Sequence, residues 1–155
     1  MNIFESLMTR DETNQAIPEL AASYTESPDH LTYTFKLRSG VHFHNGKLLT
    51  SADVVASFDR YSKVGLERAN ISNVDHWDAP DADTFVIHMK RVQPTFIEAL
   101  SSFSVPIVIF PAEFKDDPAL RLHTIGTGAL HAGPVRARRV REAEAVRRLF
   151  AQHRL

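Results

Sequence analysis

Residues 31–58 constrain the fold more than any other part of the chain, because they combine a strand pattern, two glycine turns and a helix start. In residues 31–37, four large apolar side chains alternate with two threonines and a lysine. Strict alternation of strand-favouring residues predicts a strand with one buried face. Turns at Gly40 and at Asn45-Gly46 flank a short partner strand that is predicted for residues 41–44.

A helix is predicted directly after these turns. Thr50 is followed three residues later by Asp53. This is the spacing of a capping box, in which each side chain satisfies a backbone N–H group at the helix start. The helix should end near Gly65. Its buried stripe is expected to comprise Val54, Val55, Phe58 and Tyr61.

Weaker patterns predict the remaining elements, and strands and helices together indicate a mixed α/β (α+β) fold. Alternating apolar residues predict a strand over residues 84–90, and Pro94 suits the first position of a short helix over residues 95–102. The other expected elements are a helix at 3–9, a short extended or helical segment at 17–21, an extended segment at 70–77, a strand at 106–110 and a brief helix starting at 117.

The composition is that of an ordinary globular chain. Its 155 residues can form one domain, and the hydrophobic fraction of 43% and charged fraction of 24% fit that class. No apolar run approaches the ~20 residues that span a bilayer. The absence of cysteine excludes disulfides and thiol chemistry. Residues 1–5 lack basic side chains and begin no apolar core segment, so no signal peptide is expected, and the chain as it stands should remain in the cytoplasm.

The charge distribution separates the last 27 residues from the rest. Residues 129–155 contain seven Arg, no Lys and two Glu, a charge of +5, whereas the preceding 128 residues contain 11 basic and 17 acidic side chains, a charge of −6. Such a shift indicates either a basic appendage or a change in the origin of the sequence. The basic segment has no interleaved aromatic residues and no recognition motif, so nucleic acid is not an expected partner.

The motifs around the first predicted strand and helix resemble those of the bacterial solute-binding proteins that serve ABC importers, family 5, the peptide/nickel/oligopeptide-binding class. Residues 31–46 are similar to the family run LTYTFKLRxGVxFHxG, and residues 49–60 to its run LTAxDVxxSFxR. Further resemblances are the IFExL…PxLAxS start at residues 3–7 and 17–21, the DxxTVxI strand at 83–87 and the GTGPY turn at 125–128.

The resemblance implies a partial periplasmic-binding-protein type II fold over residues 1–128, with a small subdomain and part of the large lobe. Proteins of this kind close two lobes on a peptide or other small solute and then dock on an ABC permease. The parent would be periplasmic or cell-surface, reaching the membrane only through its permease or a missing lipid anchor. No cofactor is implied. Because the opposite lobe is missing, the chain is expected to be truncated and not ligand-competent alone.

The resemblance ends after Gly128. One back-translation of residues 129–152, read one base later, resembles the family continuation and begins with its expected Pro-Phe. Residues 129–155 are therefore interpreted as an Arg-rich tail that a frameshift produced and that is not native to the fold. The alternative is a stand-alone interaction module whose basic tail contacts an acidic partner.

No constellation of residues indicates an enzyme. Ser57 and Ser101 lack the context of a nucleophile elbow, and residues 126–128 lack the lysine and the length of a phosphate loop. The aspartates beside proline and alanine are typical of turns and caps rather than paired catalytic acids. They are Asp81, Asp83, Asp116 and Asp117.

One aromatic residue and a few histidines are the remaining candidates for binding. Trp77 could stack on a ligand, although a core role is favoured. His42 and His44 alternate on a predicted strand, but two histidines are half of a metal site, and His44 matches a structural family position. No metal ligands are therefore assigned, because the other histidines considered lack partners at ligand spacing in the sequence. These are His30, His76 and His88.

Overall fold

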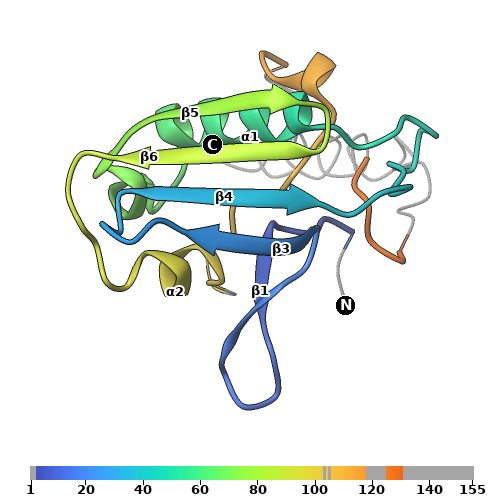
Figure 1. Cartoon of the computed structure of the whole chain (residues 1–155). Coiled ribbons are helices and arrows are strands. Elements are labelled where there is room, and N and C mark those ends of the chain that lie inside the picture. Colours follow the sequence, from blue (N-terminus) through green and yellow to red (C-terminus); the bar gives the residue numbers. More distant parts are fainter. Residues whose placement is uncertain (1–2, 103, 105, 118–124, 131–155) are drawn as a thin grey trace, which may run out of the picture.

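The computed structural model describes residues 3–102, 104, 106–117 and 125–130. At its centre is an antiparallel sheet in the strand order β3-β4-β6-β5, and the helix α1 packs across one face of it (Figure 1). Among the described helices, none is both long and apolar enough to cross a membrane. The elements of this layer pair are β3 (Ala21–Glu26), β4 (Thr32–Leu37), β5 (Val74–Asp81), β6 (Thr84–Met89) and α1 (Ser51–Val64).

Smaller elements surround this layer pair. A two-stranded hairpin of β1 and β2 projects beyond the sheet, and the short helix α2 lies beside the hairpin, next to β3 (Figure 1). One 3₁₀ turn, η1, follows α1, and a second, η2, follows the extended segment that comes after α2. The bounds are β1 (Met8–Arg10), β2 (Ala16–Pro18), η1 (Arg68–Ile71), α2 (Phe96–Leu100) and η2 (Ala112–Phe114).

The core lies between α1 and the sheet face that α1 covers. Phe35 and Phe85 from the central strands are fully buried, and the Phe85 ring lies 4.9 Å from that of Phe58 on α1. The alternation predicted for residues 31–37 is confirmed, because Tyr33, Phe35 and Leu37 are buried while Lys36 is exposed. We call the opposite side of the sheet the open face. It carries Thr32, Thr34 and Lys36 of β4, Val86 and His88 of β6, and His76 and Asp78 of β5.

The start of α1 is as predicted. Thr50 forms a capping box with Asp53, whose carboxylate accepts the Thr50 N–H at 3.0 Å, and Gly65 follows the last helical residue. Val54 and Phe58 are fully buried, while Val55 and Tyr61 pack against the core from partly buried positions. The capping pair therefore fixes the helix start that lets these side chains reach the sheet.

The glycine turns were predicted correctly, but the strand between them was not. Gly40 and Gly46 have φ angles of 73° and 82°, a region that side chains disfavour. Residues 41–44 form only an isolated bridge, between His42 and Leu48, because the tight turn at Gly46 leaves too few residues for a ladder.

Several other elements differ from the predictions. The helix expected at residues 3–9 is wrong, because the apolar side chains there are satisfied by pairing Met8–Arg10 with β2. The strand expected at 106–110 is also wrong. That segment is buried but joins no sheet, and it is held by the Ile109 N–H bond to the Glu5 carbonyl. Strand β3 was not predicted, and the strand at 84–90 and short helix at 95–102 are confirmed within two residues.

The described segments at either end of the fold lie side by side. The Gly128 N–H donates to the Ile3 carbonyl oxygen at 3.0 Å, and the His44 N–H donates to the Gly126 carbonyl oxygen. A Cβ atom on Gly126 would lie 2.0 Å from the Ile3 oxygen, so only glycine allows this approach. Residues 118–124, over which the helix expected to start at residue 117 would run, and the tail after residue 130 lie outside the described residues.

Candidate functional site

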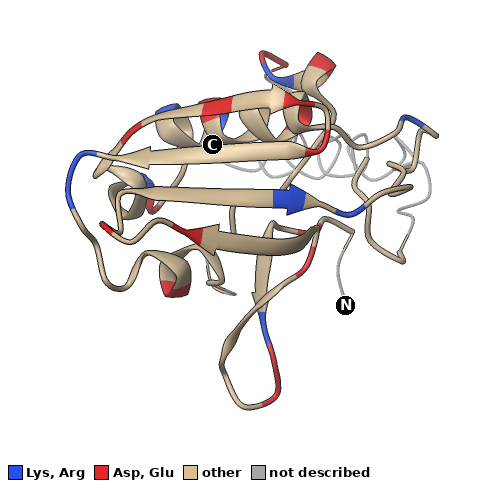
Figure 2. Ribbon diagram, in the orientation of Figure 1, with Lys and Arg blue, Asp and Glu red and all other residues tan. Residues whose placement is uncertain are grey.

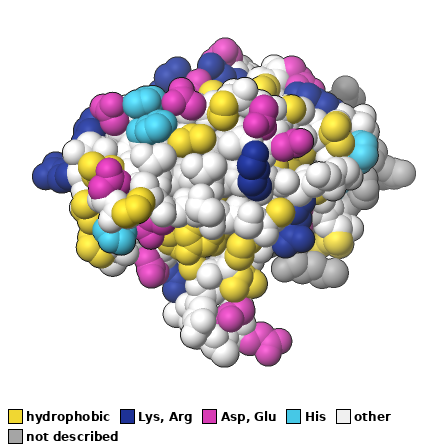
Figure 3. Space-filling model, in the orientation of Figure 1, with side chains coloured by type: hydrophobic (Ala, Val, Ile, Leu, Met, Phe, Trp, Pro, Cys, Tyr) yellow, Lys and Arg dark blue, Asp and Glu magenta, His cyan; other side chains and the backbone are white. Residues whose placement is uncertain are grey.

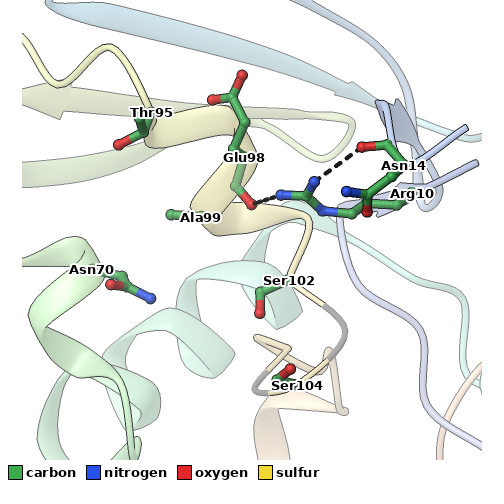
Figure 4. Close-up of a pocket in the computed structure, with 8 residues that line it drawn as sticks. All are labelled: Arg10, Asn14, Asn70, Thr95, Glu98, Ala99, Ser102 and Ser104. Atoms are coloured by element: carbon green, nitrogen blue, oxygen red, sulfur yellow. Dashed lines mark hydrogen bonds between the residues drawn. The ribbon is translucent and has the colours of Figure 1, made fainter.

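Two polar recesses meet at the β1–β2 hairpin. The first, with a volume of about 450 Å³, lies where the hairpin, η1, α2 and the segment after α2 converge (Figure 4). All of its lining residues except Ala99 are polar or charged, so a ligand there would be held through hydrogen bonds and charge. The lining residues are Arg10, Asn14, Asn70, Thr95, Glu98, Ala99, Ser102 and Ser104.

Arg10 anchors this recess. Its guanidinium donates to the backbone carbonyl of Asn14 at 3.0 Å and to that of Glu98 at 2.9 Å, so it joins the hairpin to α2 (Figure 4). Both acceptors are uncharged backbone oxygens, so these two hydrogen bonds leave the positive charge of Arg10 in place. It therefore supplies positive charge at a position that two hydrogen bonds keep fixed.

The hairpin loop owes its shape to Asp11. Its carboxylate accepts the backbone N–H groups of Gln15 and Thr13, and the Thr13 hydroxyl, which lowers the Asp11 pKa. Asn14 then adopts a φ of 65°, which Asn tolerates better than most residues. These local bonds hold Asn14 at the rim that both recesses share.

A second recess of about 450 Å³ shares Asn14 and Glu98 with the first and extends toward β3 and β4. In it, the Tyr33 hydroxyl donates to Glu26 at 2.7 Å. Burial and this carboxylate raise the Tyr33 pKa, and the hydrogen bond lowers the pKa of Glu26, so that Glu26 is anionic at neutral pH. The two recesses together thus offer a cation and an anion on one surface.

The family-like signature residues serve the fold rather than either recess. The buried Asp53 carboxylate accepts hydrogen bonds from the Ala112 N–H at 2.7 Å and from the Lys47 ammonium at 2.6 Å. These bonds join the start of α1 to η2 and to the turn that precedes α1. His44 contacts the Gly128 carbonyl oxygen through Nε2 at 2.6 Å. His42 contacts the Gly40 carbonyl oxygen through Nδ1 at 2.9 Å. Both imidazoles thus make backbone contacts, which fits the structural role predicted for His44.

The serines considered as nucleophiles are engaged in the fold. Ser57 is buried, its hydroxyl donates to the Asp53 carbonyl, and it accepts the Phe110 N–H. Ser101 donates to the Glu98 carbonyl at 3.0 Å. Asp81 and Asp83 occupy the β5–β6 turn, where the Asp83 N–H donates to the Asp81 carboxylate, as the sequence predicts.

Trp77 is half-buried on β5, on the side of the sheet that faces α1. Its indole N–H donates to Asp59 at 3.0 Å. Its ring lies edge-on to that of Phe58, with the ring centroids 5.8 Å apart. These contacts fit the favoured core role. A ligand-stacking role for Trp77 stays a prediction, although the residue also borders a surface recess of about 430 Å³.

His76 and His88 lack partners at ligand spacing in the sequence, but the structure brings them together. The antiparallel register places them directly opposite each other on β5 and β6, and Asp78 lies two residues along β5. Figure 3 shows histidine and acidic side chains gathered on the open face near these strands, and Figure 2 shows the acidic positions on β5. The sequence spacing of twelve residues conceals this contact, because only the strand pairing creates it.

The chain belongs to the bacterial extracellular solute-binding proteins of family 5, because residues 15–129 match the middle region of that family. The family comprises binding proteins and not enzymes, so the predictions of the family and of a non-enzymatic chain are confirmed. Proteins similar to this chain in sequence or structure bind peptides, glutathione or nickel complexes.

Two relatives and one solved structure illustrate the similarity. The glutathione-binding protein GsiB of Escherichia coli O6:K15:H31 (strain 536 / UPEC) is 33% identical over 130 residues, which are 82% of this chain and 25% of GsiB. The probable peptide ABC transporter periplasmic-binding protein y4tO of Sinorhizobium fredii (strain NBRC 101917 / NGR234) is 36% identical over 90 residues, 57% of this chain and 17% of y4tO.

The solved structure is that of AgaA from A. tumefaciens R10 in complex with agropinic acid. It is 31% identical with a TM-score of 0.72, and the match covers 86% of this chain and 28% of AgaA. The mixed α/β fold predicted from the sequence is thereby confirmed as part of a family-5 structure. The chain spans about a quarter of the length of the proteins it matches.

Proposed function

We propose that this chain forms part of the solute-binding component of an ABC importer, and that its solute is a peptide or a similar small molecule. The match of residues 15–129 to the family carries the proposal. GsiB and y4tO, both more than 30% identical to the chain, are named for glutathione and for peptide transport. Such a component works outside the cytoplasm and delivers its solute to a membrane permease.

The two recesses at the hairpin are the surface through which we propose that the chain meets the solute. A peptide carries a carboxylate and an ammonium group, which Arg10 and Glu26 complement in charge. Both recesses are open at the protein surface, so a bound solute would remain largely exposed to water on this chain alone. A specific site buries most of its ligand, and we therefore propose that the second wall comes from the three quarters of the family fold that this chain does not contain.

Calorimetric titration tests this division of the site. The 155-residue chain, titrated with glutathione, a dipeptide and a longer peptide, is expected to show no saturable heat at micromolar concentrations. A micromolar dissociation constant for any of them would overturn the claim that the chain needs a second wall.

A chimera tests the function itself. Residues 15–129 would replace the matching quarter of GsiB, and the product would be checked for a single cooperative unfolding transition. A folded chimera is expected to bind glutathione or a peptide. A folded chimera that binds neither would contradict the assignment, and GsiB itself is the matched control.

We also propose that residues 129–155 arise from a shifted reading frame and that the native fold continues in the neighbouring frame. The family match ends at residue 129, which supports a change of sequence at that point. Sequencing the DNA across the Gly128 codon and several hundred bases beyond provides the test. A neighbouring frame that closes quickly would favour a genuine basic tail and the interaction-module alternative.

A further inference from the structure

Three potential metal ligands converge on the open face, away from the two recesses. The Asp78 carboxylate lies 3.1 Å from His88 Nε2 and 3.6 Å from His76 Nε2. The two imidazole rings are nearly parallel, with centroids 4.3 Å apart and an interplanar angle of 13°. The three ligand atoms all lie within 4.8 Å of one another.

The strand geometry creates this convergence. His76 and His88 are directly opposed across the β5–β6 ladder, and Asp78 follows His76 on the same side of β5. The register shifts between Val74 and His76, so that Asp75 is an extra residue on β5. An extra residue of this kind bends a strand and re-aims neighbouring side chains.

The neighbouring Asp75 orients one of the imidazoles. Its carboxylate lies 2.9 Å from His76 Nδ1, and since a carboxylate only accepts, the Nδ1 atom carries the proton. The neutral His76 ring then has its lone pair on Nε2, the atom that faces Asp78. A carboxylate that fixes the tautomer of a histidine ligand is a recurrent part of metal sites.

Two of the three ligand separations fit a tetrahedral ion, and the third, between the two imidazole nitrogens, is within 4.8 Å. Ligand bonds of about 2.0–2.1 Å place neighbouring ligand atoms of a tetrahedral Zn²⁺ site about 3.3 Å apart. The observed distances of 3.1 and 3.6 Å lie on either side of that value. His76 is 54% exposed and His88 is 32% exposed, so water can fill a fourth position and an ion can enter.

We propose that His76, Asp78 and His88 form a surface site for a divalent transition-metal ion with a preference for imidazole, such as Zn²⁺. Asp75 acts as a positioning residue. Because β5 is an edge strand of the sheet, the bound ion would link this edge to β6 and restrain it. The site is separate from the solute surface and does not depend on the proposed import function.

Calorimetric titration of the 155-residue chain with Zn²⁺ tests the site, and we expect one ion per chain in the micromolar range. The double variant His76→Gln/His88→Gln should weaken this binding at least ~10-fold, and Asp75→Asn should weaken it less than the double variant does. The matched control is His42→Gln, an exposed histidine elsewhere, which should leave the affinity unchanged. Far-UV circular dichroism of each variant establishes that it is folded.

Cobalt gives a readout that needs no variant. Co²⁺ bound to the unaltered chain should show the intense visible absorption of tetrahedral coordination, and equimolar Zn²⁺ should abolish it.

Two kinds of result would overturn the proposal. The first is Zn²⁺ binding that survives unchanged in the folded double variant. The second is weak, octahedral-type Co²⁺ absorption, or the absence of Zn²⁺ binding below about 100 µM, in the unaltered chain.

Discussion

The two faces of the four-stranded sheet obey different rules although they share the same strands. The face toward α1 is filled by Phe35, Phe85 and Ile87, all with no exposed surface. The open face carries hydroxyl, amine, carboxylate and imidazole groups on β4, β5 and β6. The comparison teaches that one set of alternate positions specifies the fold, while the other is free to acquire chemistry without altering it.

The largest effect should come from emptying the face toward α1. Phe35→Ala removes a fully buried ring that contacts Phe85 and Tyr24, and we expect a loss of about 3–5 kcal/mol in the free energy of unfolding. The neighbouring open-face change Thr34→Val should alter that free energy by less than about 0.5 kcal/mol. Urea unfolding of both variants measures the contrast, and similar losses would break the comparison between the faces.

An intermediate effect is expected where the core side of the fold depends on a buried charge. Asp53→Ala removes the capping box, the Lys47 contact and the acceptor for the Ala112 N–H. We expect a loss of about 2–4 kcal/mol in the free energy of unfolding.

The control for Asp53 is the exposed acid Glu12, whose replacement by alanine should leave the thermal midpoint nearly unchanged. If Asp53→Ala proved as mild as Glu12→Ala, the signature carboxylate would have no structural role, and a role in binding would need to be considered.

The smallest effect concerns the rim between the core and the second recess. Tyr33→Phe removes the hydroxyl that lowers the Glu26 pKa from its ordinary value of 4.5, and should cost about 1 kcal/mol at pH 7. A carboxyl group whose pKa is lowered by folding stabilises the fold at pH values above its ordinary pKa. This stabilisation is lost as the pH falls through the pKa of the folded state.

The difference in unfolding free energy between the unaltered chain and Tyr33→Phe should therefore be fully present above pH 4.5 and become smaller below it. Urea titrations at pH 7 and pH 3 measure this difference. A gap that grows on acidification would show that the Tyr33 hydroxyl does not act through the Glu26 carboxylate.

Local patterns in the sequence were sufficient for the covered face of the sheet. Alternation over residues 31–37 and the Thr50–Asp53 spacing predicted β4, the helix start and much of the core, because each depends on residues close in sequence. Strand β3 escaped prediction because it lies at the sheet edge, where exposed small residues follow no strict alternation. The apolar residues near Met8 favoured a helix, but pairing with β2 decided their conformation.

Neither of the proposed sites could be located from local pattern alone. Arg10 reaches α2 across 88 residues of sequence, and the contact exists only once the hairpin and the helix are both in place. His76 and His88 meet because β5 and β6 pair in one register with an extra residue at Asp75. A shift of one residue in that register would point one of the two imidazoles into the core.

The bond between Gly128 and Ile3 has a consequence for the evolution of longer proteins. The intervening chain departs and returns through neighbouring points, so its removal or insertion would not stretch the host on either side. The sheet, its helix and the hairpin thus begin and end close together, an arrangement that tolerates insertion into a longer chain because the parts on either side are not displaced.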